Sequence, residues 1–306
     1  MVAAGLIASR FLHFSAVLLL FGAAAFLLYA YREDERSAQG DTLFRDLRNT
    51  LLFAAIVALT SGVLWLSFTS ASMSGSLAGT IDPGIVLTVI GTTDFGRVWI
   101  WRLALAVVLV VLFLPKHRNE YLALAQIAGA ALLLTTIAGT GHAGADATTM
   151  GTVHVAADSL HLLAASAWIG GLVPLAIVLA GYKPAHMPAR AEILRRFSGM
   201  GTFAVAALVA SGLANAWFEV DSLVALATTP YGRWLTIKIA LFLIMLGLAA
   251  ANRFWLIPRL AVGSADSEPS LERIRMHVAV EQAIGFLVLG VVALLGTLEP
   301  AHLQAE

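Results

Sequence analysis

The sequence contains no cysteine and few charged residues, and both shortages limit what the chain can be. Without cysteine it offers no thiolate ligand, so a metal site must use imidazole, carboxylate, thioether or backbone oxygen. Charged residues make up 12% of the 306 residues and the net charge is zero, so no nucleic-acid partner is indicated. The sequence also lacks an HExxH motif, a phosphate-binding loop and a nucleophile elbow. We therefore expect no enzyme and no nucleotide-driven transport.

Hydrophobic residues, in contrast, make up 59% of the chain. The mean hydropathy of +0.85 is too high for a soluble domain. A spanning helix needs about 20 mostly apolar residues. Eight such runs are present, at approximately residues 6–30, 50–69, 98–115, 121–140, 153–180, 198–218, 233–252 and 278–298. The predicted fold class is therefore an all-α membrane protein with eight transmembrane helices, which form a single bundle over residues 1–306.

The positions of lysine and arginine predict the orientation of this bundle, because these residues collect on the cytoplasmic side of membrane proteins. The first, third, fifth and seventh connections hold most of them, whereas the second, fourth and sixth hold only Arg97. We therefore expect both termini to be periplasmic. The first span has no basic segment before its apolar core and is long for a cleaved signal peptide, so we expect it to be retained.

The two halves of the chain, residues 1–145 and 150–306, resemble each other. The matching pairs are Leu12 and Leu160, His13 and His161, Gly22 and Gly170, Ser61 and Ser211, Gly62 and Gly212, Trp65 and Trp217, Arg102 and Lys238, Gln126 and Gln282, and Gly129 and Gly285. Each half also has a helix-start signal before a short apolar stretch, at Asp82 and at Asp221. The pattern predicts a 4+4 parallel pseudo-repeat, with its axis along the membrane normal.

The fifth span carries His154, Asp158 and His161 in its first turns. Their spacing places all three on one helical stripe. Ionisable groups inside a spanning helix are costly and usually mark a functional site, although such groups near the surface also serve only to hold helices together. The predicted topology puts His13 and His142 at the same outer side. Imidazole with carboxylate, in a site without thiolate, suits copper, zinc, iron or nickel.

These residues predict a ladder of metal sites. Along a helix His154 and His161 are roughly 10 Å apart, which is too far to bind one ion comfortably. We therefore expect an outer position formed by His154 with His142, and an inner position formed by His161 with His13. Asp158 would act as a ligand or would fix the tautomer of an imidazole.

Other polar residues give weaker signals. His277 and Glu281 lie one turn apart at the inner start of the eighth span and could form an exit site or a proton acceptor, but a snorkelling pair at the interface is the favoured interpretation. Arg10, Arg102 and Lys238 are likewise expected to snorkel, unless they line a polar path. The residues interpreted mostly as membrane-interface anchors are Trp99, Trp101, Trp217, Trp234 and Trp255. Three more residues lie on the predicted periplasmic side, namely Met73, Met150 and His302.

Three stretches of the sequence resemble the copper resistance protein D (CopD) family of bacterial inner-membrane proteins. They are GHA at residues 141–143, HVAADSLHLLAASAWIGGL at 154–172, and the segment from RRFSGMG at Arg195 to ANRFWLIPRL, which ends at 260. The resemblance implies eight spanning helices, a CopD-like core domain over about residues 190–298, and copper transport across the inner membrane. It also implies a separate periplasmic copper-binding partner of the CopC type.

The favoured hypothesis is a copper permease that carries Cu(I) or Cu(II) as its cargo, surrounded by membrane lipid. The first alternative is an electron carrier with b-type haem between His13 and His161, which a Soret absorbance band would reveal. The second alternative is a copper sensor or assembly subunit that does not transport, and it would bind copper without producing flux in proteoliposomes.

Overall fold

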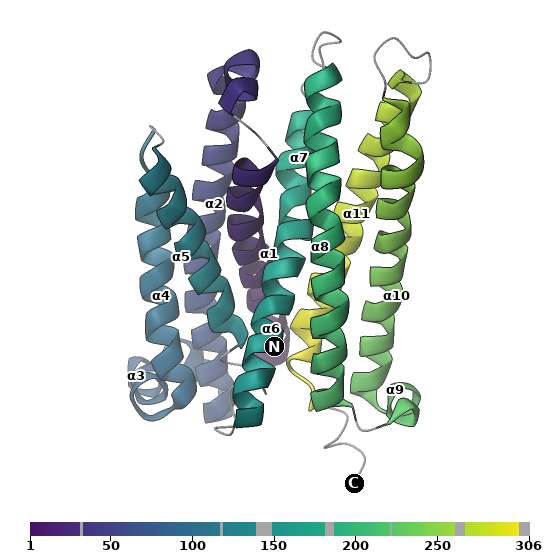
Figure 1. Cartoon of the computed structure of the whole chain (residues 1–306). Coiled ribbons are helices and arrows are strands. Elements are labelled where there is room, and N and C mark those ends of the chain that lie inside the picture. The colour runs from purple at the N-terminus through teal and green to yellow at the C-terminus, as the bar shows by residue number, and fades with distance from the viewer. Residues whose placement is uncertain are drawn as a thin grey trace.

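The computed structural model describes residues 1–30, 33–116, 119–138, 149–180, 187–220, 222–260 and 267–299, and in these segments it contains helices and no strand (Figure 1). The α-helices are α1 (Val2–Tyr29), α2 (Glu33–Ser74), α3 (Pro83–Thr92), α4 (Asp94–Phe113), α5 (Glu120–Ala138), α6 (Thr149–Ala165), α7 (Gly171–Ala180), α8 (Met187–Glu219), α9 (Leu223–Thr228), α10 (Pro230–Ala251) and α11 (Ser267–Leu295). Short 3-10 turns are η1 (Leu77–Thr80) and η6 (Ile257–Arg259), and π-helical turns are η3 (Ser166–Gly170) and η5 (Asn252–Leu256).

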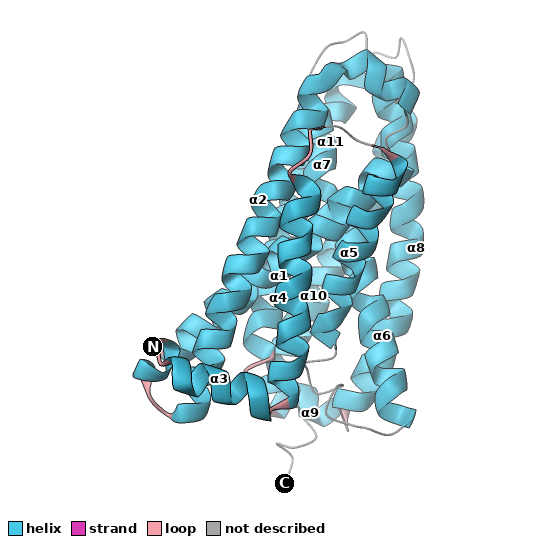
Figure 2. Cartoon of the chain, turned by 90° about the vertical axis from the view of Figure 1, so that its left-hand side faces the viewer, coloured by secondary structure: helices cyan, strands magenta, loops and turns pink. Residues whose placement is uncertain are grey.

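The prediction of eight spanning helices is confirmed. Eight helices in the described residues are long and apolar enough to cross a membrane, and they run side by side along the bundle (Figures 1 and 2). Their bounds are Val2–Tyr29, Arg45–Ser74, Asp94–Phe113, Glu120–Ala138, Thr149–Ala180, Ala189–Glu219, Pro230–Arg259 and Ser267–Leu295. The fifth span thus joins α6, η3 and α7, and the seventh joins α10, η5 and η6.

One end of the bundle holds the start of α1, the end of α11 and the short helices α3 and α9 (Figures 1 and 2). We call it the terminal end. The two short helices form where the sequence predicts them, because a polar side chain caps each start. Asp82 accepts hydrogen bonds from two backbone amides of α3 at 2.8 and 3.3 Å. Ser222 accepts one from the Ala225 amide at 3.2 Å and is the cap of α9.

The first and fifth spans form the centre of the bundle. In each of them 61% of the apolar window is buried, compared with 6% in the seventh span. Their backbones approach closely where Gly22 meets Gly170. Only glycine fits at this crossing, because a Cβ atom at either position would collide with the backbone of the other helix. Beside this crossing the Ser166 hydroxyl donates a hydrogen bond to the Leu18 backbone oxygen at 2.5 Å.

Candidate metal centre

His161 lies on α6 and faces α8, where its Nδ1 atom is 3.1 Å from the hydroxyl oxygen of Ser211. That hydroxyl donates its single proton to the backbone oxygen of Ala207 at 2.5 Å, so its oxygen accepts from the imidazole. The neutral His161 ring is therefore protonated at Nδ1. Its Nε2 atom keeps the lone pair that a metal ion requires.

His13 on α1 has the same arrangement with α2. Its Nδ1 atom lies 3.0 Å from the backbone oxygen of Ala58 and 3.2 Å from the hydroxyl of Ser61. The Ser61 hydroxyl donates to the Val57 backbone oxygen at 2.5 Å, so both neighbours of Nδ1 are acceptors. The buried Nε2 atom has no hydrogen-bond partner in the described part of the chain. This imidazole is also oriented as a metal ligand would be.

Two further polar pairs continue along the interface between α6 and α8, toward the terminal end. The Asn215 amide donates a hydrogen bond to Asp158 Oδ1 at 3.3 Å. One turn further, His154 Nε2 lies 4.0 Å from Glu219 Oε1, and the His154 ring stacks on Phe218 with their centroids 4.5 Å apart. All three residues of the predicted stripe on the fifth span thus face α8. We call His154, Asp158, His161, Ser211, Asn215 and Glu219 the His161 cluster.

The seventh span closes the side of the His161 cluster. The Tyr231 hydroxyl of α10 donates a hydrogen bond to Glu219 Oε2 at 2.5 Å, which fixes that carboxylate. Lys238, also on α10, lies within electrostatic range of both Asp158 and His161. The cluster therefore combines two imidazoles and two carboxylates with one nearby cation.

Aromatic and cationic side chains surround His13 instead. The His13 ring lies beside Trp65 and Trp99, with centroid distances of 5.6 and 6.4 Å. The guanidinium of Arg10 lies 4.9 Å from the Trp65 ring, and that of Arg102 lies 4.2 Å from the Trp99 ring. Such contacts are favourable cation–π interactions. We call these five residues, together with Ser61, the His13 cluster.

The structure brings only some of the predicted site residues together. His154, Asp158 and His161 share one interface, and His13 lies in the other cluster with its hydrogen bonds in its own half of the chain. His142 lies outside the described residues. Within the described ranges, no group of three or more His, Cys, Asp or Glu side chains could hold a metal ion. The joint positions of His154 with His142 and of His161 with His13 stay predictions.

Three predictions about interfacial side chains are wrong. Arg102 does not snorkel: it is fully buried, and its Nε donates to the Thr136 hydroxyl at 3.0 Å. Trp99 is not an interface anchor, because it is also fully buried and donates to the Gly62 backbone oxygen at 3.0 Å. Glu281 is 2% exposed and not at a lipid surface. In each case the polar atom has a partner on a neighbouring helix.

Sequence reasoning missed Asn215 and Glu219, although α8 carries a signal for both. Ser211, Asn215 and Glu219 follow one another at steps of four residues, which places them on one face of the helix. A second polar stripe opposite that of His154, Asp158 and His161 would have suggested that the fifth and sixth spans pack through these faces.

These features define the protein as a multi-pass membrane protein with histidine and carboxylate side chains packed between its helices. The chain belongs to the copper resistance protein D family. Residues 191–295 match the family described as copper resistance protein D, and residues 1–152 match the copper resistance protein D-like N-terminal domain.

Similar proteins extend over most of the chain. Copper resistance protein D of Pseudomonas syringae pv. tomato is 33% identical over 303 residues, which cover 96% of each chain. Inner membrane protein YebZ of Escherichia coli is 31% identical over 294 residues, covering 96% of this chain and 98% of that protein. Copper transport protein CutJ of Bacillus subtilis is 31% identical over 81% of this chain, which corresponds to 46% of CutJ. No solved structure matches the chain.

Proposed function

We propose that this protein transports copper across the bacterial inner membrane and that the His161 cluster is its first binding site. The single observation that carries the proposal is the contact between His161 Nδ1 and the Ser211 hydroxyl. Because that hydroxyl donates to Ala207, we assign the imidazole proton to Nδ1, which leaves Nε2 as the unprotonated nitrogen. Asp158 lies one turn before His161 on α6 and Glu219 lies beside His154, so carboxylates that favour a cation follow the same interface. Membership of the copper resistance protein D family supports copper as the cargo.

The proposed orientation puts the terminal end of the bundle in the periplasm. The opposite end of the bundle carries Arg45 and Arg48 on α2, Lys116 after α4 and Arg259 on η6, as the positive-inside rule requires of the cytoplasmic side. Copper would then enter from the periplasm, at the end of the bundle where α6 begins (Figure 1). A periplasmic copper-binding protein of the CopC type would deliver the ion there.

A parallel repeat of four plus four helices accounts for the pairing of the two clusters. Leu18 and Ser166, which contact each other, stand five residues after His13 and His161 respectively. Such a contact between corresponding positions is expected where a pseudo-two-fold axis crosses the first and fifth spans. We therefore infer that the His13 cluster is the first-half counterpart of the copper site.

The ion would move in steps along the interface of α6 and α8. Glu219 and His154 would receive it with His142 from the fourth connection, and Asp158 and His161 would receive it next. Imidazole and carboxylate ligands accept Cu(II) and imidazole also accepts Cu(I), so both oxidation states suit the residues present. No covalent chemistry is part of this proposal.

Substitution of His161 tests the function directly. His161→Ala is expected to lower copper accumulation in cells and copper bound to purified protein, because it removes the open Nε2 ligand. Met150→Ala is the matched control, since Met150 lies on the same helix and is 64% exposed. Immunoblots of membranes must give equal abundance for both variants. Unchanged copper accumulation in His161→Ala would contradict the proposal, and a Soret band in the purified protein would favour a haem protein instead.

A further inference from the structure

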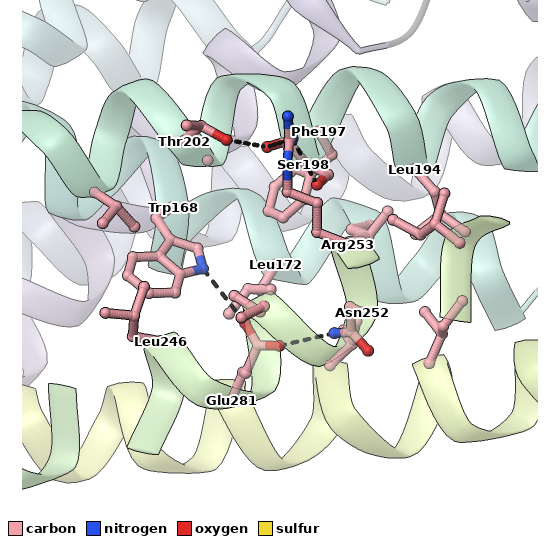
Figure 3. A pocket seen from close by; sticks show the side chains of 18 of the residues that line it. Trp168, Leu172, Leu194, Phe197, Ser198, Thr202, Leu246, Asn252, Arg253 and Glu281 are labelled. Carbon is pink, nitrogen blue, oxygen red and sulfur yellow. Dashed lines mark hydrogen bonds between the residues drawn. The ribbon is translucent and has the colours of Figure 1, made fainter. Parts of the chain in front are cut away.

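A cavity of about 200 Å³ lies toward the opposite end of the bundle from the His161 cluster, between η3, α7, α8, α10, η5 and α11 (Figure 3). Most of its wall is apolar, with Leu172, Leu194 and Leu246 among the lining residues. Glu281 of α11 also lines it. An acidic side chain in such an apolar space inside a spanning helix is costly and marks a functional site by default.

Two neutral groups hold the Glu281 carboxylate. The Asn252 amide donates to Oε1 at 3.0 Å, and the Trp168 indole donates to Oε2 at 3.3 Å (Figure 3). Arg253 is the cation among the lining residues, but its Nη1 donates to the Ser198 backbone oxygen at 2.9 Å and hydroxyl at 3.1 Å. Two hydrogen bonds from neutral donors stabilise a buried carboxylate only in part. This carboxylate is therefore poised to bind a cation or a proton.

Both donors to Glu281 stand on π-helical turns, Trp168 on η3 and Asn252 on η5. A π-turn inserts one extra residue into a helix and changes the direction of the side chains near it, and such turns are frequent at functional sites. The two π-helical turns thus lie on different spans, and each supplies a hydrogen-bond donor to the same carboxylate. Their coincidence is an observation independent of the charge of Glu281.

A hydrogen-bond chain leads from Glu281 to a more accessible residue. His277, which is half-buried one turn before Glu281, has its Nδ1 atom 2.8 Å from Asn252 Oδ1. Because the amide nitrogen of Asn252 donates to Glu281, its oxygen must accept from His277 Nδ1. The titratable groups around the carboxylate are thus His277 on α11 and Arg253 on η5.

The geometry points to Glu281 as the proton-binding site that couples copper movement to a flow of protons. On loading, one carboxylate oxygen takes a proton from a hydronium ion on the His277 side: an O–H bond of hydronium breaks, the carboxyl O–H bond forms, and a water molecule is left. The new hydroxyl needs an acceptor, so the Asn252 amide turns over: its oxygen accepts from Glu281 and its nitrogen donates to His277 Nδ1. His277 then carries its proton on Nε2 instead, by exchange with water. Release reverses each step, and nothing is oxidised or reduced.

Infrared spectroscopy tests proton binding without copper. Purified protein in lipid is titrated with acid, and the carbonyl band of a protonated carboxylic acid is followed. The band is expected in the wild type and in Glu272→Gln, an exposed acid on the same helix, and its loss is expected in Glu281→Gln. His277→Gln should keep the band but shift its frequency, because the chain beyond Asn252 changes. Absence of the band in the wild type, or its persistence in Glu281→Gln, would overturn the inference.

Coupling rests on the proposed copper transport and needs a second experiment. Proteoliposomes with a trapped pH indicator receive a copper gradient, and copper and pH are recorded together. The wild type is expected to move protons with copper, and Glu281→Gln to lose proton movement while it still binds copper. Copper flux without any pH change in the wild type would overturn the coupling and leave the proposed function intact. Absence of copper flux in the wild type would instead contradict the proposed function, and the infrared result would still decide proton binding.

Discussion

The His13 cluster and the His161 cluster share one arrangement and differ in the charges around it. In both, the imidazole Nδ1 donates to a serine hydroxyl of the following span, at 3.2 and 3.1 Å respectively. Three residues before each histidine stands a charged side chain, which is Arg10 in the first half and Asp158 in the second. The residue four positions after each serine contacts that charged side chain. It is Trp65, which contacts Arg10, in the first half and Asn215, which contacts Asp158, in the second.

The difference separates holding an imidazole from making a metal site. Two guanidiniums, those of Arg10 and Arg102, lie over aromatic rings beside His13 and would repel a cation there. Along the interface of α6 and α8 the charges are mixed: Asp158 lies one turn before His161 and Glu219 lies beside His154, while Lys238 is near both Asp158 and His161. The serine contact orients the ring in both places, but only the second half places carboxylates along the same interface. We infer that the first half keeps the scaffold and the second half carries the binding.

The largest effect is expected where the two halves meet. Gly170→Val should greatly reduce the yield of folded protein, because its side chain would collide with the backbone of α1 at Leu18 and Gly22. Both clusters would be lost together. Size-exclusion chromatography in detergent measures the yield of monodisperse protein. Gly247→Val is the control, since its Cβ atom would meet nothing within 4 Å. Equal yields of the two variants would mean that the first and fifth spans do not pack tightly here.

The next largest effect is expected when the charge of the second cluster is made to match the first. Asp158→Arg puts a guanidinium one turn from His161, and reversing a unit charge about 4 Å from a singly charged ion costs about 8 kcal/mol of Coulomb energy at an effective dielectric constant of 20. Copper bound to purified protein, measured by elemental analysis, should fall to background. Asp158→Asn should keep part of the binding. Full binding by Asp158→Arg would show that charge does not distinguish the clusters.

The fold could be predicted from the sequence to a large extent, because the bilayer sets the length of each apolar run. The stripe of His154, Asp158 and His161 was also accessible, since helical spacing alone places its members on one face. The residues that contact this stripe could not be predicted, because helical spacing within one span does not say which neighbouring helix that face meets. Hydropathy also gave the wrong environment for Arg102 and Glu281. A polar side chain inside a span looks the same in sequence whether it snorkels or bonds to a neighbouring helix.

The smallest effect, and the sharpest comparison, comes from removing the serine of each cluster in turn. Ser211→Ala leaves His161 without the hydroxyl that orients its ring, and loss of such a partner typically weakens metal binding roughly 10- to 100-fold. Ser61→Ala is the matched variant in the first half. Each histidine keeps a backbone acceptor, which is Ala58 for His13 and Leu208 for His161, but the His13 cluster lies outside the proposed copper site, so copper affinity should not change in Ser61→Ala. Copper titration of both purified variants measures the difference. If both variants lose affinity equally, the two imidazoles bind one ion together, as the sequence first suggested. If neither variant loses copper affinity, the serines contribute only to helix packing, and another contact must orient the His161 ring.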